Sequence, residues 1–260
     1  MRHWPSTTLR AWLAAYAMLT AYAVLASAMG LPAPGAGITA PLSLMAFAFA
    51  LLHAWLAWGA RRALSLLGLT AVLSWAFEAV GVATGWVYGP YHYMGLLGPK
   101  LMGVPLLIPI AWFMMSYPSL AIARALWPQG RKAPAAALAG LAAAVMTAWD
   151  LVMDPMMVRI GFWVWEVEGA YFGVPIQNYI GWILTTFVFF WLYLRVEPRL
   201  PGRASAGLRT GDDGLPALAY LTTWAGNALA AVQLGLSVPA LVSLFSAGLL
   251  GWLGYLHSRS

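Results

Sequence analysis

The chain has 260 residues, of which 62% are hydrophobic and 8% charged, against about 25% charged residues in ordinary soluble domains. This composition indicates an integral membrane protein. The chain contains no cysteine, which excludes disulfides, thiolate nucleophiles, iron–sulfur clusters and cysteine-ligated zinc. Its net charge of +6 comes from Lys and Arg scattered in short loops between apolar stretches. We therefore interpret the charge as a topology signal and not as a nucleic-acid-binding surface.

Eight stretches approach the roughly 20 apolar residues that a helix needs to cross a membrane. The first is of full span length and lacks a convincing cleavage site, so we expect a retained span and not a signal peptide. Because Gln233 to Pro239 leaves little room for a turn, seven spans are an alternative to eight. The fold prediction is an all-α, polytopic membrane helix bundle that forms a single domain over residues 1–260. The predicted spans are 9–30, 41–60, 63–84, 101–126, 134–153, 176–196, 215–233 and 236–256.

Positive charge collects on the cytoplasmic side of membrane proteins. With eight spans and a cytoplasmic N-terminus, twelve basic residues fall on that side and only Lys100 and Arg159 on the other. This bias predicts a multi-pass protein of the cell membrane with both termini in the cytoplasm. The segment 197–214 is then a cytoplasmic linker without chemistry. The twelve residues are Arg2, Arg10, Arg61, Arg62, Arg124, Arg131, Lys132, Arg195, Arg199, Arg203, Arg209 and Arg259.

Two long loops on the extracytoplasmic side, residues 85–100 and 154–175, are rich in aromatic residues. Such loops are either interfacial belts, where Trp and Tyr lie at headgroup level, or walls of a pocket for an apolar ligand. Composition alone slightly favours the belt. The aromatic residues include Trp86, Tyr88, Tyr91, Trp163, Trp165 and Tyr171.

A weak internal repeat links the regions around these loops. Gly103-Val104-Pro105 recurs as Gly173-Val174-Pro175, and Trp112 recurs as Trp182, at one spacing of 70 residues. Upstream, with a small gap, we align Glu78 of the third span with Asp150 of the fifth. The pattern predicts two units of helix, loop and helix, and membrane folds often place their site where such repeats meet.

Three of the eight acidic residues, Glu78, Asp150 and Asp154, fall within or at the end of predicted spans. An acidic residue at the centre of a span costs about 2.5–3.5 kcal/mol on insertion scales, so each one indicates a functional site. Asp150 and Asp154 are four residues apart and share one helical face. All three acids lie at similar depth in the extracytoplasmic half, where Asn178 joins them. We expect a polar cluster there.

Each acid also has a structural interpretation. Glu78 and Asp150 would then form hydrogen bonds between helices, and Asp154, which precedes Pro155, would have a turn or capping role at a helix end. His53 and His92 are single histidines, so we expect no metal site.

The catalytic interpretation follows from the same residues. A carboxylic acid that stays protonated in an apolar site is suited to donate a proton. A second, more solvated carboxylate positions water, and aromatic faces stabilise a carbocation. Together these groups predict protonation of an isolated alkene in a lipid-soluble substrate, followed by capture of the cation by water. This chemistry requires no cofactor.

Two segments resemble the CruF-type carotenoid hydratase family, which includes bisanhydrobacterioruberin hydratases. The resemblance covers residues 75–197 and departs mainly at Tyr179, where a phenylalanine is expected. The first segment runs from Glu78-x-x-Gly81-x-x-Thr84-Gly85 to Gly103-Val104-Pro105-x-x-x-Pro109-x-x-Trp112. The second runs from Asp150-x-x-x-Asp154-Pro155 through Trp163-x-Trp165 to Tyr171-Phe172-Gly173-Val174-Pro175-x-x-Asn178-x-x-Gly181-Trp182.

The resemblance implies addition of water across the terminal 1,2 double bond of an acyclic carotenoid end group, of the γ-carotene, lycopene or bisanhydrobacterioruberin type. A carotenoid and membrane lipid are the implied partners, and association with other carotenoid-pathway enzymes is compatible with it. When the acid and base roles are assigned to residues of these motifs, Glu78 or Asp150 is the proton donor and the other is the base. Asp154, Asn178 and Tyr171 orient them. The remaining candidates for the end-group pocket are Trp86, Tyr88, Tyr91, Trp163, Trp165 and Trp182.

Other functions share these features. A membrane carotenoid cyclase generates the same cation but captures it with a neighbouring double bond. A prenyltransferase would hold Mg²⁺ and diphosphate with Asp150-x-x-x-Asp154, but the chain has one such motif, on the side away from the cytoplasm. A retinal photoreceptor needs a lysine inside a span, whereas Lys100 and Lys132 lie in or beside loops. A transporter or a pigment-binding protein without activity is the non-catalytic alternative.

Overall fold

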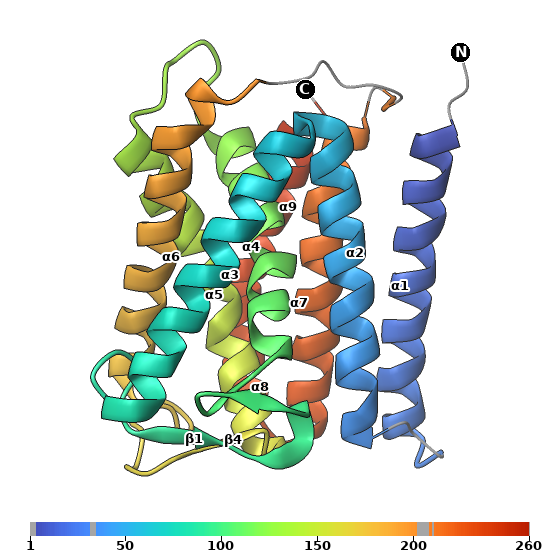
Figure 1. The fold of residues 1–260 in the computed structure, drawn as a ribbon. Helices are drawn as coiled ribbons and strands as arrows, with labels where there is room; N and C mark the ends of the chain where they lie inside the picture. Colours follow the sequence, from blue (N-terminus) through green and yellow to red (C-terminus); the bar gives the residue numbers. More distant parts are fainter. Residues whose placement is uncertain (1–3, 32–34, 202–207, 210, 260) are drawn as a thin grey trace.

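The computed structural model describes residues 4–31, 35–201, 208–209 and 211–259. Arg2 and Arg203 of the predicted cytoplasmic set lie outside these residues. Eight long helices in the described part run side by side (Figure 1). They are α1 (Trp4–Ala28), α2 (Thr39–Trp58), α3 (Ala60–Thr84), α4 (Leu107–Leu126), α5 (Ala135–Ile160), α6 (Ile176–Val196), α7 (Leu215–Gln233) and a final helix. The final helix joins α8 (Ser237–Ser243), a π-helical turn (Leu244–Gly248) and α9 (Leu249–His257).

Seven of the described helices are long and apolar enough to cross a membrane, which confirms the prediction of a polytopic helical bundle. The helix that does not meet this criterion is α7, which carries Thr222, Thr223 and Asn227. It still runs beside the other helices and packs against α1, α4 and α5 (Figure 1). Its polar residues are therefore covered largely by neighbouring helices.

Two predicted boundaries are wrong. The helix α4 begins at Leu107 and not at residue 101, because β2 (Lys100–Leu101) and β3 (Val104–Pro105) form a short antiparallel pair before it. The helix α5 continues through Pro155 to Ile160, since a proline inside a membrane helix removes one backbone donor that its surroundings can compensate. Asp154 therefore lies within the helix and has no capping or turn role at its end.

A tight turn allows the short segment before Pro239 to connect the two helices α7 and α8. Gly235 adopts a φ of +80°, and the backbone N–H of Leu236 donates to the carbonyl of Ala231 at 2.8 Å. A glycine adopts this left-handed conformation at no steric cost. The chain thus reverses direction within about three residues.

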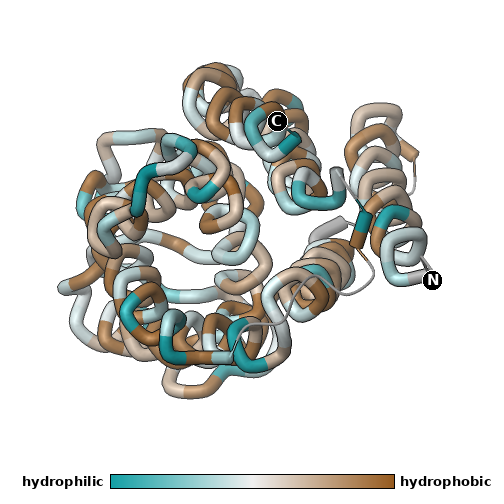
Figure 2. The backbone as a smooth tube through the Cα atoms, turned by 90° about the horizontal axis from the view of Figure 1, so that it is seen from above, coloured by the Kyte–Doolittle hydropathy of each residue, from teal (hydrophilic) through white to brown (hydrophobic). Residues whose placement is uncertain are grey.

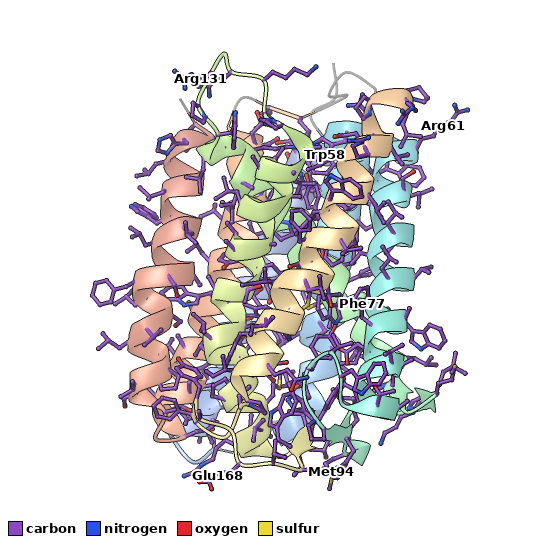
Figure 3. All side chains as sticks on the ribbon, turned by 90° about the vertical axis from the view of Figure 1, so that its left-hand side faces the viewer. Trp58, Arg61, Phe77, Met94, Arg131 and Glu168 are labelled. Carbon is purple, nitrogen blue, oxygen red and sulfur yellow. The ribbon has the colours of Figure 1, made fainter. Side chains whose placement is uncertain are left out.

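The two ends of the bundle differ. Both termini lie at one end, the termini end, and β1 (Tyr91–Tyr93) and β4 (Trp163–Trp165) lie at the other, the strand end (Figure 1). Figure 3 shows Arg61 and Arg131 at the termini end and Met94 and Glu168 at the strand end. Of the basic residues that the structure describes, Lys100 and Arg159 are the ones on helices and strands near the strand end.

The predicted repeat appears as two matching turns. Leu101 pairs with Val104 across Met102 and Gly103, whose φ angles are +52° and +81°. Tyr171 pairs with Val174 across Phe172 and Gly173, whose φ angles are +50° and +86°. Two central residues with positive φ are typical of the type I′ hairpin turn. Each turn precedes the second helix of its unit, α4 or α6.

The helices α4 and α5 form the centre of the bundle, and α1 lies at its edge. In the most apolar 18-residue stretch of α4 and of α5, two thirds of the residues are buried, against 22% in that of α1. Seen along the bundle, the N-terminal helix lies at the periphery (Figure 2). Its principal neighbours are α2 and α7.

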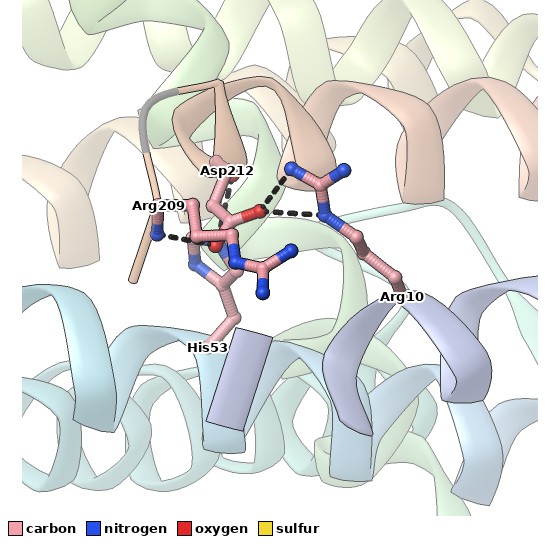
Figure 4. A network of polar contacts seen from close by, with 4 residues as sticks. All are labelled: Arg10, His53, Arg209 and Asp212. Atoms are coloured by element: carbon pink, nitrogen blue, oxygen red, sulfur yellow. Dashed lines mark hydrogen bonds and ion pairs between the residues drawn. The ribbon is translucent and has the colours of Figure 1, made fainter. Parts of the chain in front are cut away.

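A polar network holds α1 at the termini end (Figure 4). Arg10 donates from Nε and Nη2 to Oδ1 of the buried Asp212, at 2.9 and 2.8 Å. The backbone N–H of Arg209 donates to Oδ2 of Asp212 at 2.7 Å. His53 of α2 lies 3.0 Å from the carbonyl of Asp212 through Nε2 and 2.6 Å from the Tyr117 hydroxyl through Nδ1. The network connects α1, α2, α4 and the segment before α7.

The contact between α1 and α7 can be tested by crosslinking. A Cβ placed on Gly226 would lie 4.0 Å from Cβ of Thr20, within the range of about 3.5–4.5 Å found in disulfides. Because the chain has no cysteine, the variant Thr20→Cys with Gly226→Cys is expected to form one intramolecular disulfide on mild oxidation. Mass analysis of linked proteolytic fragments measures it, and each single-cysteine variant is the control. A double variant that stays reduced would contradict this packing of α1.

Candidate active site

A cavity of about 700 Å³ lies in the half of the bundle next to the strand end. This volume is within the range of about 300–1,000 Å³ typical of small-molecule sites. Its wall is mainly apolar and aromatic, with a few polar groups that include Glu78, Asp154 and Asn178. The aromatic residues of the wall include Tyr88, Tyr91, Tyr93, Trp112, Trp149, Trp163, Trp165 and Trp182.

Glu78 of α3 accepts hydrogen bonds from three aromatic side chains. The hydroxyls of Tyr91 and Tyr93 both donate to Oε2, the latter at 2.8 Å, and Nε1 of Trp112 donates to Oε1 at 3.2 Å. Tyr91 and Tyr93 alternate along β1 and therefore point to the same face of the strand. Both oxygens of a buried carboxyl group are satisfied, which lowers the cost of placing it in an apolar bundle.

The two tyrosines act as donors to this group. Burial raises the pKa of Tyr91 and of Tyr93 well above the ordinary tyrosine value, and the adjacent Glu78 carboxylate raises it further. Both hydroxyls therefore keep their protons at neutral pH and remain available to donate to Glu78.

Asp150 and Asp154 of α5 are bridged by one amide. Nδ2 of Asn178 donates to Oδ2 of Asp154 and, at 3.1 Å, to Oδ2 of Asp150. Nε1 of Trp163 donates to Oδ1 of Asp154 at 2.7 Å. Oδ1 of Asp150 is buried and has no hydrogen-bond partner among the residues that the structure describes. Asp154 lines the cavity and Asp150 does not, so Asp150 lies behind its neighbour.

Pairing of β1 with β4 brings the two acidic groups to the same cavity. Tyr93 lies opposite Trp163 and Tyr91 opposite Trp165. The ring centroids of these pairs are 5.7 and 4.9 Å apart. Two of the donors to Glu78, Tyr91 and Tyr93, and one donor to Asp154, Trp163, thus belong to one two-stranded sheet.

The structural equivalent of Glu78 is Asp154. Each lies seven residues before the left-handed glycine that follows its helix, Gly85 after α3 and Gly161 after α5. Each also receives a hydrogen bond from the strand that follows. The alignment of Glu78 with Asp150 is therefore shifted by one helical turn, and Asp150 is an additional acid in the second unit.

Two tryptophans from the repeated helices meet at the cavity wall. The rings of Trp112 of α4 and Trp182 of α6 stack with their centroids 4.3 Å apart and their planes 19° from parallel. Trp149, next to Asp150 in sequence, contacts Trp182 edge-on at 6.1 Å. The cavity thus has indole surface beside both acidic groups.

Most of the predicted site residues lie together. Glu78, Asp154 and Asn178 reach the cavity, as do the aromatic candidates other than two. Trp86 is 80% exposed and lies away from the cavity. Tyr171 is outside the wall as well and packs edge-on against Phe172 and Tyr179.

Three aromatic wall residues beside the acidic groups, Tyr93, Trp112 and Trp149, were not among the sequence candidates. Tyr93 shares the β1 face of Tyr91, Trp112 belongs to the repeat, and Trp149 adjoins Asp150. Strand alternation would have identified Tyr93, had β1 been predicted. No sequence signal indicates that Trp149 faces the cavity.

Tyr88 joins α3 to α6 beneath the cavity. Its ring lies between Gly81 and Gly181, and its hydroxyl is 2.9 Å from Oγ1 of Thr185. A Cβ on Gly181 would lie 2.5 Å from the carbonyl oxygen of Val87 and 2.6 Å from Cδ1 of Tyr88. These two glycines therefore allow the close approach of the loop to both helices.

The fold and the cavity define a polytopic helical membrane protein in which buried carboxyl groups converge on an aromatic-lined space. The family described as carotenoid biosynthesis protein matches residues 38–250, and the chain belongs to this family.

A bisanhydrobacterioruberin hydratase of Haloarcula japonica is 40% identical to this chain over 126 residues. The matched region makes up 48% of this chain and 42% of that protein. No solved structure matches the chain.

The glycine contact with Tyr88 gives a stability test. Gly181→Ala is expected to destabilise the fold by about 1–3 kcal/mol, because the new methyl group meets backbone and a buried ring. Gly68→Ala is the matched control, since a Cβ there has no heavy atom within 4 Å and alanine is the better helix former. Unfolding midpoints in detergent measure both variants. Equal midpoints would contradict the packing of Tyr88.

Proposed function

We propose that this protein is a carotenoid hydratase, which adds water across the terminal 1,2 double bond of an acyclic carotenoid end group. The observation that carries the proposal is the placement of Glu78 and Asp154 on one aromatic-lined cavity. Membership of the carotenoid biosynthesis family and similarity to a protein named bisanhydrobacterioruberin hydratase support it. Substrates of the bisanhydrobacterioruberin, lycopene or γ-carotene type fit the apolar wall.

The aspartate pair supplies the proton. Two buried carboxyl groups that share the Asn178 amide are close enough to hold one proton between them. Asp154 lines the cavity and delivers this proton to C-2 of the end group. Asp150 lies behind it and acts as a positioning residue that retains the proton on the pair. The positive charge then develops at C-1, a tertiary carbon.

Glu78 is the base. Three donors converge on its carboxyl group, and these hydrogen bonds oppose the preference of a buried acid for its neutral form. A water molecule beside it attacks C-1 and loses a proton to Glu78, which gives the tertiary 1-hydroxy end group. The sum of the two steps is the addition of one water. Transfer of the proton from Glu78 back to the aspartate pair through water completes the cycle.

The aromatic wall stabilises the cation between the two steps. The faces of indole and phenol rings carry negative charge density and attract a cation within about 6 Å. Trp112 and Trp182 provide such faces beside Glu78, and Trp163 and Trp165 provide them on the strand side. A cavity closed to water would instead favour capture by a neighbouring double bond, which is cyclisation.

We also propose an orientation for the site. The termini end carries nearly all described basic residues, which is typical of the cytoplasmic side. The cavity then opens in the extracytoplasmic half of the cell membrane.

Expression in a bacterial host that accumulates lycopene tests the reaction. The expected product is heavier than lycopene by one water for each hydrated end, with the visible polyene spectrum unshifted. Mass analysis of extracted pigments measures it, with the empty vector as control. A product of unchanged mass with an altered spectrum would establish cyclisation instead. If γ-carotene were also left unchanged, the hydratase proposal would fail.

Amide variants test the roles of the acids. Glu78→Gln and Asp154→Asn are expected to lower turnover at least 100-fold, in line with the usual contribution of general acid–base catalysis. Asp150→Asn is expected to lower it at least tenfold through loss of the shared proton. Glu168→Gln, on the exposed loop at the strand end (Figure 3), is the matched control. Full activity of Glu78→Gln or Asp154→Asn in folded protein would refute the assignment.

A further inference from the structure

The cavity extends well beyond the acidic groups. One part of its wall is formed by α1 and α7, which lie apart from the carboxyl-bearing helices α3 and α5 in sequence. This part is here called the side arm. Its wall residues are Tyr16, Thr20, Ala23, Val24, Ser27 and Ala28 of α1 and Thr223, Gly226, Asn227, Ala230 and Gln233 of α7. Five of these eleven residues are Ala, Gly or Ser, and these five positions leave room for a ligand along the wall.

The side arm reaches the surface of the bundle. Ser27, Ala28 and Gln233 line the cavity and are also exposed. They lie at the strand ends of α1 and α7, at the edge of the bundle (Figure 1). The cavity is therefore connected to the surface of the bundle at the edge formed by α1 and α7.

Most polar side chains of the side arm form hydrogen bonds within the protein. The hydroxyls of Tyr16 and Thr223 lie 2.9 Å apart, and Oγ1 of Thr20 donates to the carbonyl of Tyr16 at 2.9 Å. Nε2 of Gln233 donates to the carbonyl of Val24 at 3.0 Å. The surface that these residues leave for a ligand is chiefly hydrocarbon. It suits an apolar chain and offers little to a charged headgroup.

We propose that the side arm binds the polyene chain of the substrate. The reacting end lies at Glu78 and Asp154, and the chain runs along the wall formed by α1 and α7 and leaves the protein toward the bilayer at Ser27 and Gln233. This inference rests on the proposed function for the class of ligand. It adds the site of the chain and the route by which a long, water-insoluble substrate reaches buried acids.

Filling the side arm tests the proposal. Ala230→Phe places a ring in the side arm, whereas Leu229→Phe places one at a neighbouring position that is 56% exposed and outside the wall. Ser27→Phe and Leu25→Phe form a second matched pair on α1, because Leu25 is 58% exposed and outside the wall. Each variant in phospholipid nanodiscs is titrated with lycopene, and the circular dichroism induced in the visible band of the bound polyene is followed.

The expected result is a dissociation constant for lycopene at least tenfold higher in Ala230→Phe and Ser27→Phe than in their partners. Hydration of a short acyclic isoprenoid with the same end group is expected to change less than twofold. Equal lycopene affinity within both pairs would overturn the proposal. A loss of activity toward the short isoprenoid as large as the loss of lycopene binding would also overturn it. Because the binding measurement does not depend on turnover, a side-arm effect without any hydrated product would refute the hydratase and leave the chain site standing.

Discussion

Three carboxyl groups lie inside an apolar helix bundle, and the need to give them hydrogen-bond donors governs the structure around them. Unsatisfied carboxyl groups at this depth cost several kcal/mol. Side chains supply the donors, because helical backbone groups are already paired. Of the six hydrogen bonds that the structure describes to these acids, three come from the two loops, from Tyr91, Tyr93 and Trp163. The other three come from Trp112 of α4 and Asn178 of α6. Folding of the loops onto the bundle therefore accompanies burial of the acids.

The same requirement shows why the sequence revealed part of the site. Apolar stretches predict the helices, and the scarcity of acids in them singles out Glu78, Asp150 and Asp154 at one depth. The pairing of β1 with β4 joins loops some 70 residues apart, and the three-residue strands have no distinctive pattern. Both Trp86 and Tyr91 were therefore predicted as pocket residues, although Trp86 is exposed and Tyr91 contacts Glu78. Pro155 predicted a helix end, whereas α5 continues to Ile160, nearly two turns past the predicted end at residue 153.

The two units of the internal repeat share a backbone arrangement, but their acidic residues have different hydrogen-bond partners. Both units have a type I′ turn, a left-handed glycine after the first helix and an acid seven residues before it. In the first unit three donors surround a single acid. In the second, Asp154 shares an amide with Asp150. The repeat thus places two carboxyl groups with different partners at one cavity. In the mechanism we propose, these partners hold the two groups in different protonation states.

The proposed route from the site to the membrane follows α1, and this helix is held unevenly along its length. At the termini end it is fixed by the bidentate contact of Arg10 with buried Asp212, and at mid-length by the Tyr16–Thr223 contact. Toward the strand end the side-chain hydrogen bond that the structure describes is that of Gln233 to a backbone carbonyl, at an exposed position. Strong polar contacts thus anchor α1 far from the strand end, where we propose that an apolar chain passes. This distribution suits the proposed substrate, because its unreacted part would remain in lipid while one end reaches the acids.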